Sequence, residues 1–347
     1  MTTEQPLVLV TGGAGFIAGH VIAALLEKGY RVRTTARSLD REVQVREQLA
    51  RLGADPGDRL ELVVADLLDD DGWDAAVRGA DHVLHVASPV LPGHVENEDD
   101  VIVPAREGTL RVLRAAHEAG VKRVVLTSAF HAIGFGWGRT EHTFTDDDWS
   151  PLDGPGMDAY GRSKVLAERA AWDFARESGL ELVAVNPVAV LGPVTSSSVT
   201  GGNAIVRSIL SGQVDSYPNL WIPIVDVRDV AAAHVLAMTA PQAAGQRFLV
   251  GSGDGLTLEA IGAVLRARLG DAASRVTTRT TPSEVIRAAA ESNPAMRGLA
   301  DDIDIVKQID ASKIRRVLGW HARPIEDTVV DAATSMLDLG LITPAGR

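Results

Sequence analysis

A tyrosine and a lysine four residues apart form the first pair of side chains that could do chemistry. They are Tyr160 and Lys164, in the segment YGRSK at 160–164. Positions i and i+4 of a helix lie on one face, so the two side chains can share a site. A free tyrosine has a pKa of ~10 and exchanges protons poorly at neutral pH, but a nearby ammonium group favours the phenolate and lowers that pKa. Such a tyrosine could give a proton to a carbonyl oxygen while hydride reaches the carbon, and the lysine could also hold ribose hydroxyls.

A second pattern, VTGGAGFIA at 10–18, could bind phosphate. Gly12 and Gly13 permit a tight turn, and Gly15 lets the backbone approach a pyrophosphate closely. The free amides at the start of a following helix would face the phosphates. A surface turn that needs only one glycine is the alternative interpretation. Because an apolar run precedes the loop and a helical pattern follows it, we favour the nucleotide site.

The end of the second expected strand bears on which nucleotide binds. NAD sites usually place Asp or Glu there to hold the ribose 2′-hydroxyl, but this segment has no carboxylate until Asp40. Arg37 could instead grip a 2′-phosphate through charge-assisted hydrogen bonds. Arg33 is a second candidate, and either arginine could be an ordinary surface charge. We therefore expect NADP(H), with NAD(H) less favoured.

These motifs need a parallel sheet to bring them together. Short apolar runs alternate with amphipathic stretches through the first half of the chain, which is typical of strand–helix–strand units. We expect strands at 7–10, 30–36, 60–65, 82–87, 123–127 and 182–185. Helices are expected at 16–28, around 106–119 and from about 160. The pair Tyr160 and Lys164 then lies on the helix between the fifth and sixth strands.

The second half of the chain is less regular. Residues 191–224 are rich in Gly, Ser and Pro and a loop is expected at 201–222, whereas 270–305 have no clean period. Helices are expected at 228–239 and 257–269, and a strand at 246–250. The predicted fold class is α/β, a Rossmann-type doubly wound parallel sheet with a smaller, mixed α/β C-terminal substrate lobe. The expected nucleotide-binding domain covers 1–187 plus about 225–240, and the lobe covers 188–224 and 241–347.

Composition narrows the function classes. The net charge is −12 without a basic block, so we expect no nucleic-acid partner. There is no cysteine, which excludes disulfides and thiolate chemistry. No histidine pair has the spacing of a zinc site, so we expect no metal. A polar start at 1–6 and the lack of an 18-residue apolar run predict a cytoplasmic protein without a signal peptide or membrane span.

Together the motifs resemble the extended short-chain dehydrogenases/reductases. Within them, the chain is similar to dihydroflavonol 4-reductase and related aldehyde and ketone reductases. The matching segments are TGGAGFIAGH at 11–20, RTTARS at 33–38, ADLLDDDGW at 65–73, HVASP at 85–89, VVLTS at 124–128, YGRSK at 160–164, NPVAVLGP at 186–193, VDVRDVAAAH at 225–234 and LGW at 318–320. They span residues 7 to about 330.

The resemblance implies a set of cofactor contacts along the chain. Asp66 and Leu67 would flank the adenine, although Asp66 could equally be a helix N-cap. The full implied cofactor set is Thr11, Gly12, Gly15, Phe16, Ile17, Arg37, Asp66, Leu67, Val86, Ala87, Ser88, Tyr160, Lys164, Pro187 and Val190. In it, residues 86–88 line the nicotinamide ribose, and Pro187 and Val190 lie beside the nicotinamide.

One position departs from the family pattern. Where related enzymes carry the serine that binds the substrate oxygen, this chain has Ala129. The neighbouring Ser128 is the candidate for that role, with Thr127 or a backbone amide as fallbacks, although consecutive strand residues point to opposite faces. His131 is more simply a pocket-wall residue than an acid or base.

The resemblance implies an NADPH-dependent carbonyl reductase with Ser128, Tyr160 and Lys164 as catalytic residues. One alternative is a nucleotide-sugar epimerase or dehydratase, which would favour an acid in place of Arg37. Another is a regulator that senses NADP without turnover. Phe135, Trp137, Tyr217 and Trp221 offer apolar walls, which favours a small hydrophobic or aromatic carbonyl substrate. A monomer or homodimer is expected.

Overall fold

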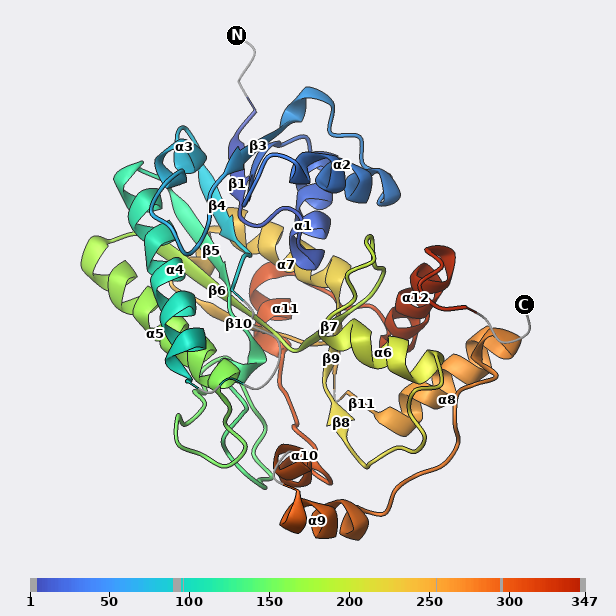
Figure 1. Ribbon diagram of the computed structural model, residues 1–347. Helices are drawn as coiled ribbons and strands as arrows, with labels where there is room; N and C mark the ends of the chain where they lie inside the picture. Colours follow the sequence, from blue (N-terminus) through green and yellow to red (C-terminus); the bar gives the residue numbers. More distant parts are fainter. Residues whose placement is uncertain (1–4, 90–94, 96, 254, 294–295, 344–347) are drawn as a thin grey trace.

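A parallel sheet of seven strands forms the centre of the molecule, as the computed structural model shows (Figure 1). The structure describes residues 5–89, 95, 97–253, 255–293 and 296–343. The strands are β1 (Leu7–Val10), β2 (Arg31–Ala36), β3 (Leu60–Val64), β4 (His82–His85), β5 (Arg123–Thr127), β6 (Glu181–Pro187) and β10 (Arg247–Val250). Their order is β10-β6-β5-β4-β1-β2-β3, and every neighbouring pair is parallel. The order reverses between β1 and β4, and open α/β sheets bind ligands at such a reversal.

Helices cover both faces of this sheet because its strands are apolar on both sides. Side chains alternate: Val8 and Val10 belong to one core cluster, and Leu9 between them belongs to the other. The first cluster is completed by α1 (Phe16–Glu27), α2 (Arg41–Arg51), α7 (Val227–Thr239) and α11 (Ser312–Leu318). The second is completed by α3 (Trp73–Val77), α4 (Asp99–Glu118) and α5 (Ala159–Ser178). The doubly wound α/β fold expected from the sequence is confirmed.

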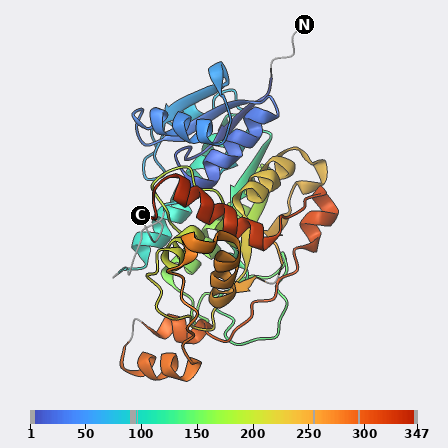
Figure 2. The ribbon, with the colours of Figure 1, turned by 90° about the vertical axis from the view of Figure 1, so that its right-hand side faces the viewer.

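A third apolar core lies in the C-terminal lobe. The lobe contains two small sheets, one of β7 (Ala189–Leu191) with β9 (Ile224–Asp226) and one of β8 (Trp221–Ile222) with β11 (Leu256–Thr257). Helices α6 (Gly202–Leu210), α8 (Leu258–Leu269) and α12 (Ile325–Asp338) pack around them. Helices α9 (Ser283–Ser292) and α10 (Arg297–Asp302), drawn in orange, lie at one end of the molecule. The N-terminal strands, drawn in blue, lie at the opposite end (Figures 1 and 2).

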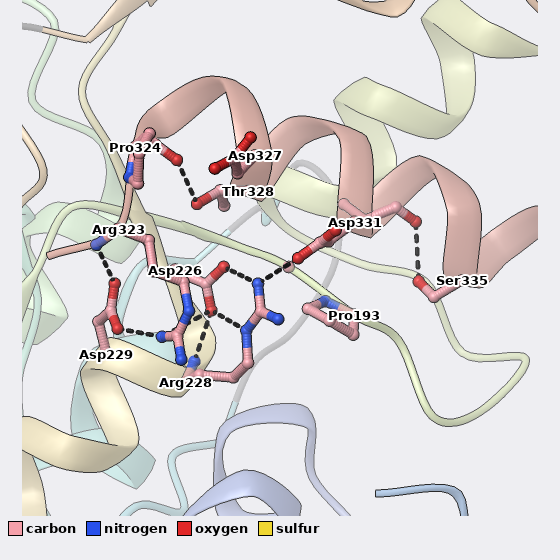
Figure 3. Close-up of polar contacts among 12 residues, drawn as sticks. Pro193, Asp226, Arg228, Asp229, Arg323, Pro324, Asp327, Thr328, Asp331 and Ser335 are labelled. Atoms are coloured by element: carbon pink, nitrogen blue, oxygen red, sulfur yellow. Dashed lines mark hydrogen bonds and ion pairs between the residues drawn. The ribbon is translucent and has the colours of Figure 1, made fainter. Parts of the chain in front are cut away.

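Charged side chains join the lobe to the sheet domain where α7 begins (Figure 3). The buried carboxylate of Asp226 accepts two hydrogen bonds from the Arg228 guanidinium, at 2.8 and 2.7 Å. Arg228 also donates to Asp331 on α12, at 2.6 Å. One turn along α7, Asp229 pairs with Arg323, which directly precedes α12. Helix α12 is therefore tied to the same end of α7 by two arginines.

Two sequence expectations need correction. The strand expected at 246–250 exists, but it pairs in parallel with β6 inside the main sheet, so it does not belong to the lobe to which 241–347 were assigned. The loop expected at 201–222 contains α6 and the short strand β8. The rest of the domain division remains a prediction. No helix within the described ranges is long and apolar enough to cross a membrane.

Candidate active site

The glycine-rich loop between β1 and α1 is held tightly against its neighbours. The Thr11 hydroxyl accepts hydrogen bonds from the amides of Val86 and Ala87, at 3.0 and 2.9 Å. Gly12 has φ +72°, and a Cβ there would lie 2.9 Å from the Ala87 Cβ. A Cβ on Gly13 would lie 2.3 Å from the Thr34 hydroxyl. Only glycine therefore fits this turn at both positions.

Helix α1 begins at Phe16 without a side-chain cap on its N-terminus. Its first amides, those of Phe16 and Ile17 among them, therefore lack the partner that a capping residue would give them. Uncapped amides and the helix dipole form a site suited to phosphate. The loop geometry and the open helix end together fit the pyrophosphate of a dinucleotide.

The two arginines near the end of β2 differ in their surroundings. Arg33 is 12% exposed and binds Glu61 at 2.8 Å and the carbonyl oxygen of Arg78 at 2.6 Å. Arg37 is exposed directly after the strand and has no hydrogen bond or ion pair to another described residue. Of the two candidates, Arg37 alone is available to a ligand at this edge of the sheet.

Most of the remaining predicted cofactor residues lie at the carboxyl ends of three strands of the main sheet, β3, β4 and β6. Asp66 and Leu67 come after β3, and the Asp66 carboxylate accepts from the Leu68 amide at 3.0 Å. Val86, Ala87 and Ser88 come after β4 and are partly buried; Pro187 ends β6 and is buried, and Val190 in β7 is partly buried. Because all main-sheet strands are parallel, these residues meet at one edge of the sheet.

Tyr160 and Lys164 lie in the first turns of α5. The side chain of Asp158 caps this helix by accepting from the Gly161 amide at 2.7 Å. The Lys164 Nζ lies 5.5 Å from the Tyr160 ring centroid and donates to the Ser88 hydroxyl at 3.0 Å. Lys164 is only 8% exposed, whereas Tyr160 is partly open to solvent. The pair thus shares one helix face beside the end of β4.

Ser128 is buried, and its hydroxyl already makes a hydrogen bond within the protein. It donates to the Glu168 carboxylate at 2.5 Å. Glu168 also accepts from Asn186 at 2.7 Å and from Arg247 at 2.6 Å. Ser128 lines a cavity of about 10 Å³ with Lys164 and Glu168, which has room for about one water molecule. Its role as a substrate-orienting hydroxyl stays a prediction.

His131 occupies the position next to the Tyr160 ring. The two ring centroids are 4.9 Å apart with the planes nearly perpendicular, and His131 stacks on Phe135 at 3.9 Å. Burial lowers the pKa of His131 to about 3, and the cations of Lys164 and Lys307 add to this effect. The ring is therefore neutral at pH 7.

A larger cavity of about 270 Å³ begins beyond Phe135. Phe135 and Trp137 line it as expected, together with Lys307, whose Nζ lies 4.3 Å from the Phe135 ring centroid. Tyr217, by contrast, is 1% exposed in the core of the lobe and cannot be a pocket wall. No group of three His, Asp or Glu residues in the described parts of the chain could hold a metal ion.

Two sets of charged residues near the site were not predicted from the sequence. They are the ion pair of Glu168 and Arg247, and Lys307. Glu168 could have been noticed, since it is four residues after Lys164 and so on the same helix face. Its partner Arg247 is distant in sequence and gave no local signal. Lys307 follows the stretch 270–305 that showed no period, so nothing predicted its place beside the cavity.

The chain is similar to a protein family and to several reductases of known name. The model of the NAD dependent epimerase/dehydratase family matches residues 8–251. Cinnamoyl-CoA reductase 1 from Arabidopsis thaliana is 40% identical over 248 residues, covering 71% of this chain and 70% of the relative. Ketoreductase azaE from Aspergillus niger is 34% identical, covering 95% of this chain and 97% of the relative.

Solved structures of reductases are also similar to this chain. Yeast methylglyoxal/isovaleraldehyde reductase Gre2, complexed with NADPH, has a TM-score of 0.79 at 28% identity, covering 97% of this chain and 100% of that one. Gre2 from Candida albicans in complex with NADPH has a TM-score of 0.78 at 27% identity, covering 96% and 99%. Vestitone reductase from alfalfa, with a TM-score of 0.74 at 24% identity over 97% of this chain and 100% of that one, shares the fold.

Proposed function

Since this chain belongs to the NAD-dependent epimerase/dehydratase family, we propose that it reduces an aldehyde or ketone to an alcohol with NADPH. It is an NAD(P)-dependent oxidoreductase of the reductase branch, with the relatives and Gre2 structures above as its neighbours. One observation carries the proposal. Tyr160 and Lys164 share a face of α5, and Lys164 is held by Ser88 at the sheet edge that also carries the glycine-rich loop.

The proposal assigns the cofactor to the carboxyl edge of the sheet. The amides of the glycine-rich loop and α1 would hold the pyrophosphate, and Arg37 would hold the 2′-phosphate through its guanidinium fork. The proposed cofactor residues are Thr11, Gly12, Gly15, Phe16, Ile17, Arg37, Asp66, Leu67, Val86, Ala87, Ser88, Tyr160, Lys164, Pro187 and Val190. The NADPH in both Gre2 complexes supports this choice of nucleotide.

The chemistry requires two transfers to the carbonyl group. Bound NADPH supplies the hydride that the carbonyl carbon accepts. Tyr160 gives its phenolic proton to the oxygen, so that the carbonyl becomes an alcohol. Lys164 stabilises the tyrosinate that remains and is placed to hold the ribose beside Ser88. Proton replacement from solvent returns Tyr160 to its starting state.

The substrate class follows from the walls near Tyr160. Phe135 and Trp137 favour a hydrophobic or aromatic carbonyl compound, although Arg139, Lys307 and two aspartates also line this cavity. The second candidate, a nucleotide-sugar epimerase or dehydratase, shares the family and the Tyr-Lys pair. Arg37 in place of a carboxylate after β2 argues against it. A regulator that only senses NADP would not need both Tyr160 and Lys164.

The experiment follows NADPH and NADH oxidation with isovaleraldehyde, methylglyoxal and benzaldehyde as probes. We expect turnover that prefers NADPH, and a fall on the order of 10³-fold in Tyr160→Phe because the proton donor is lost. Tyr30→Phe, a partly buried tyrosine packed on the far side of the first core, is the matched control. Tight NADP binding without any turnover would support the regulator, and turnover in Tyr160→Phe would exclude the proposed acid.

A further inference from the structure

The proton donor needs a second group that fixes the carbonyl oxygen, and the nearest serine is not free to do so. The Ser128 hydroxyl donates to Glu168 at 2.5 Å, and Glu168 has no exposed side-chain surface. Ser128 faces a cavity of about 10 Å³, which is too small for a carbonyl substrate. The next residue, Ala129, has only a methyl group.

His131 is the polar side chain that faces the Tyr160 ring from the other side of this turn. It lies in the short helix η2 (Phe130–Ala132), which directly follows Ala129. Its ring lies between two aromatic contacts, with Tyr160 at 4.9 Å and Phe135 at 3.9 Å. Lys307 lies 4.3 Å from the Phe135 ring centroid. The position of the imidazole is therefore set by packing rather than by a polar partner.

The ring nitrogens of His131 have no hydrogen-bond partner among the described residues, and the residue is partly exposed. The buried histidines elsewhere in the sheet domain differ. His234 uses both ring nitrogens, with Thr127 at 2.7 Å and the Val230 carbonyl at 2.8 Å, whereas His85 bonds Thr11 through Nδ1 at 2.9 Å and its Nε2 has no partner among the described residues. A neutral imidazole has one N–H donor and one acceptor nitrogen. In His131 neither nitrogen is used by a described residue, so both remain available to a ligand.

We propose that His131 donates a hydrogen bond to the carbonyl oxygen of the substrate and so orients it beside Tyr160. The inference rests on the proposed reductase function. The pKa lowered to about 3 fits this role, since the ring stays neutral and Tyr160 remains the acid. The donor strengthens as negative charge develops on the oxygen, so it acts chiefly on kcat.

The decisive comparison is between His131→Asn and His131→Leu. These side chains are close in size and both remove the imidazole, but only asparagine keeps a donor. We expect His131→Leu to lower kcat on the order of 10²-fold with the best carbonyl probe, and His131→Asn to retain at least about ten times more activity. His131→Phe, which keeps the stacked ring without a donor, should lose as much as His131→Leu.

The controls distinguish three outcomes: an error in the role of His131, a role for Ser128 in its place, and an error in the proposed reductase function. The same pair of substitutions at exposed His117 on α4 should leave kcat unchanged, and NADPH affinity should stay constant in every variant. Equal activity of His131→Asn and His131→Leu would overturn the inference, as would near-wild-type turnover of His131→Phe. A 10²-fold loss in Ser128→Ala alone would return the role to Ser128. An inactive wild-type protein would instead contradict the proposed reductase function.

Discussion

At the residue scale, the carboxylate of Glu168 joins several elements in the interior behind α5. It is fully buried and accepts from Ser128, Asn186 and Arg247. The Arg247 guanidinium also lies 3.8 Å over the Trp149 ring. A buried charge is stable only while its partners are in place. Glu168 thus links Ser128, directly after β5, to β6 and β10.

Removing one member of this ion pair should destabilise the fold strongly. We expect Arg247→Met and Glu168→Leu each to lower the free energy of unfolding by about 3–5 kcal/mol, because each leaves a buried charge unpaired. The double variant should lose clearly less than the sum. Urea unfolding of all three gives the coupling. The exposed pair Asp173 and Arg176 on the same helix is the control, and additive losses at the buried pair would contradict the prediction.

The exposed arginine after β2 gives a prediction on cofactor choice. Arg37→Ser removes the cation proposed to bind the 2′-phosphate, so the Kd for NADPH should rise by about 10–100-fold while the Kd for NADH changes little. Fluorescence titration with both nucleotides measures this. Arg41→Ser removes a nearby exposed cation on α2 and should affect neither. An equal effect of Arg37→Ser on both nucleotides would place Arg37 outside the phosphate site.

At the element scale, local sequence patterns predicted where the strands and helices lie. They did not predict which strands pair or which elements pack together. Each apolar run became a strand because its residues fill both faces of the sheet. The position of β10 next to β6 could not be predicted, since no local pattern sets the order of strands. The Tyr160 and Lys164 pair was readable because helical spacing alone places both on one face. The pair of Glu168 and Arg247 depends on the tertiary fold, which sequence spacing does not show.

Gly12, in the turn between β1 and α1, should tolerate no side chain. Gly12→Ala combines a strained φ of +72° with a Cβ 2.9 Å from the Ala87 Cβ. Gly29→Ala has a similar φ of +85° but open space around the new Cβ. We expect a loss of about 1 kcal/mol in Gly29→Ala from strain alone. Gly12→Ala should lose more and also weaken NADPH binding, as thermal melts and titration would show; equal losses would mean that the contact with Ala87 is unimportant.

At the scale of the whole molecule, three buried histidines and the partly exposed His131 make stability depend on pH. Burial lowers the pKa to about 4 in His20 and His234, and to about 3 in His85 and His131. In the unfolded chain these groups bind protons near pH 6.5. Between that value and pH 4 the unfolded state therefore holds more protons, and the folded state loses stability as the pH falls.

This linkage predicts that the free energy of unfolding falls steeply as the pH is lowered below about 6.5. Each histidine contributes up to about 1.4 kcal/mol per pH unit below its unfolded pKa. Urea unfolding at pH 7 and pH 5 should show a marked drop in the free energy of unfolding. His234→Gln should have a shallower slope by about one proton, because one buried titrating group is gone. A free energy that is constant between pH 7 and pH 5 would contradict the lowered pKa values.

The chain crosses between its two parts several times. It leaves the main sheet after β6, returns for α7 and β10, and enters the lobe again at β11. Ile309 to Trp320 then pack on the first sheet core before α12 ends in the lobe, where Arg228 and Arg323 fasten it (Figure 3). A recombinant exchange of the substrate lobe with a relative therefore cannot be made with one crossover. A chimera needs matched junctions at each passage, and the α7–α12 arginine contacts must come from the same parent.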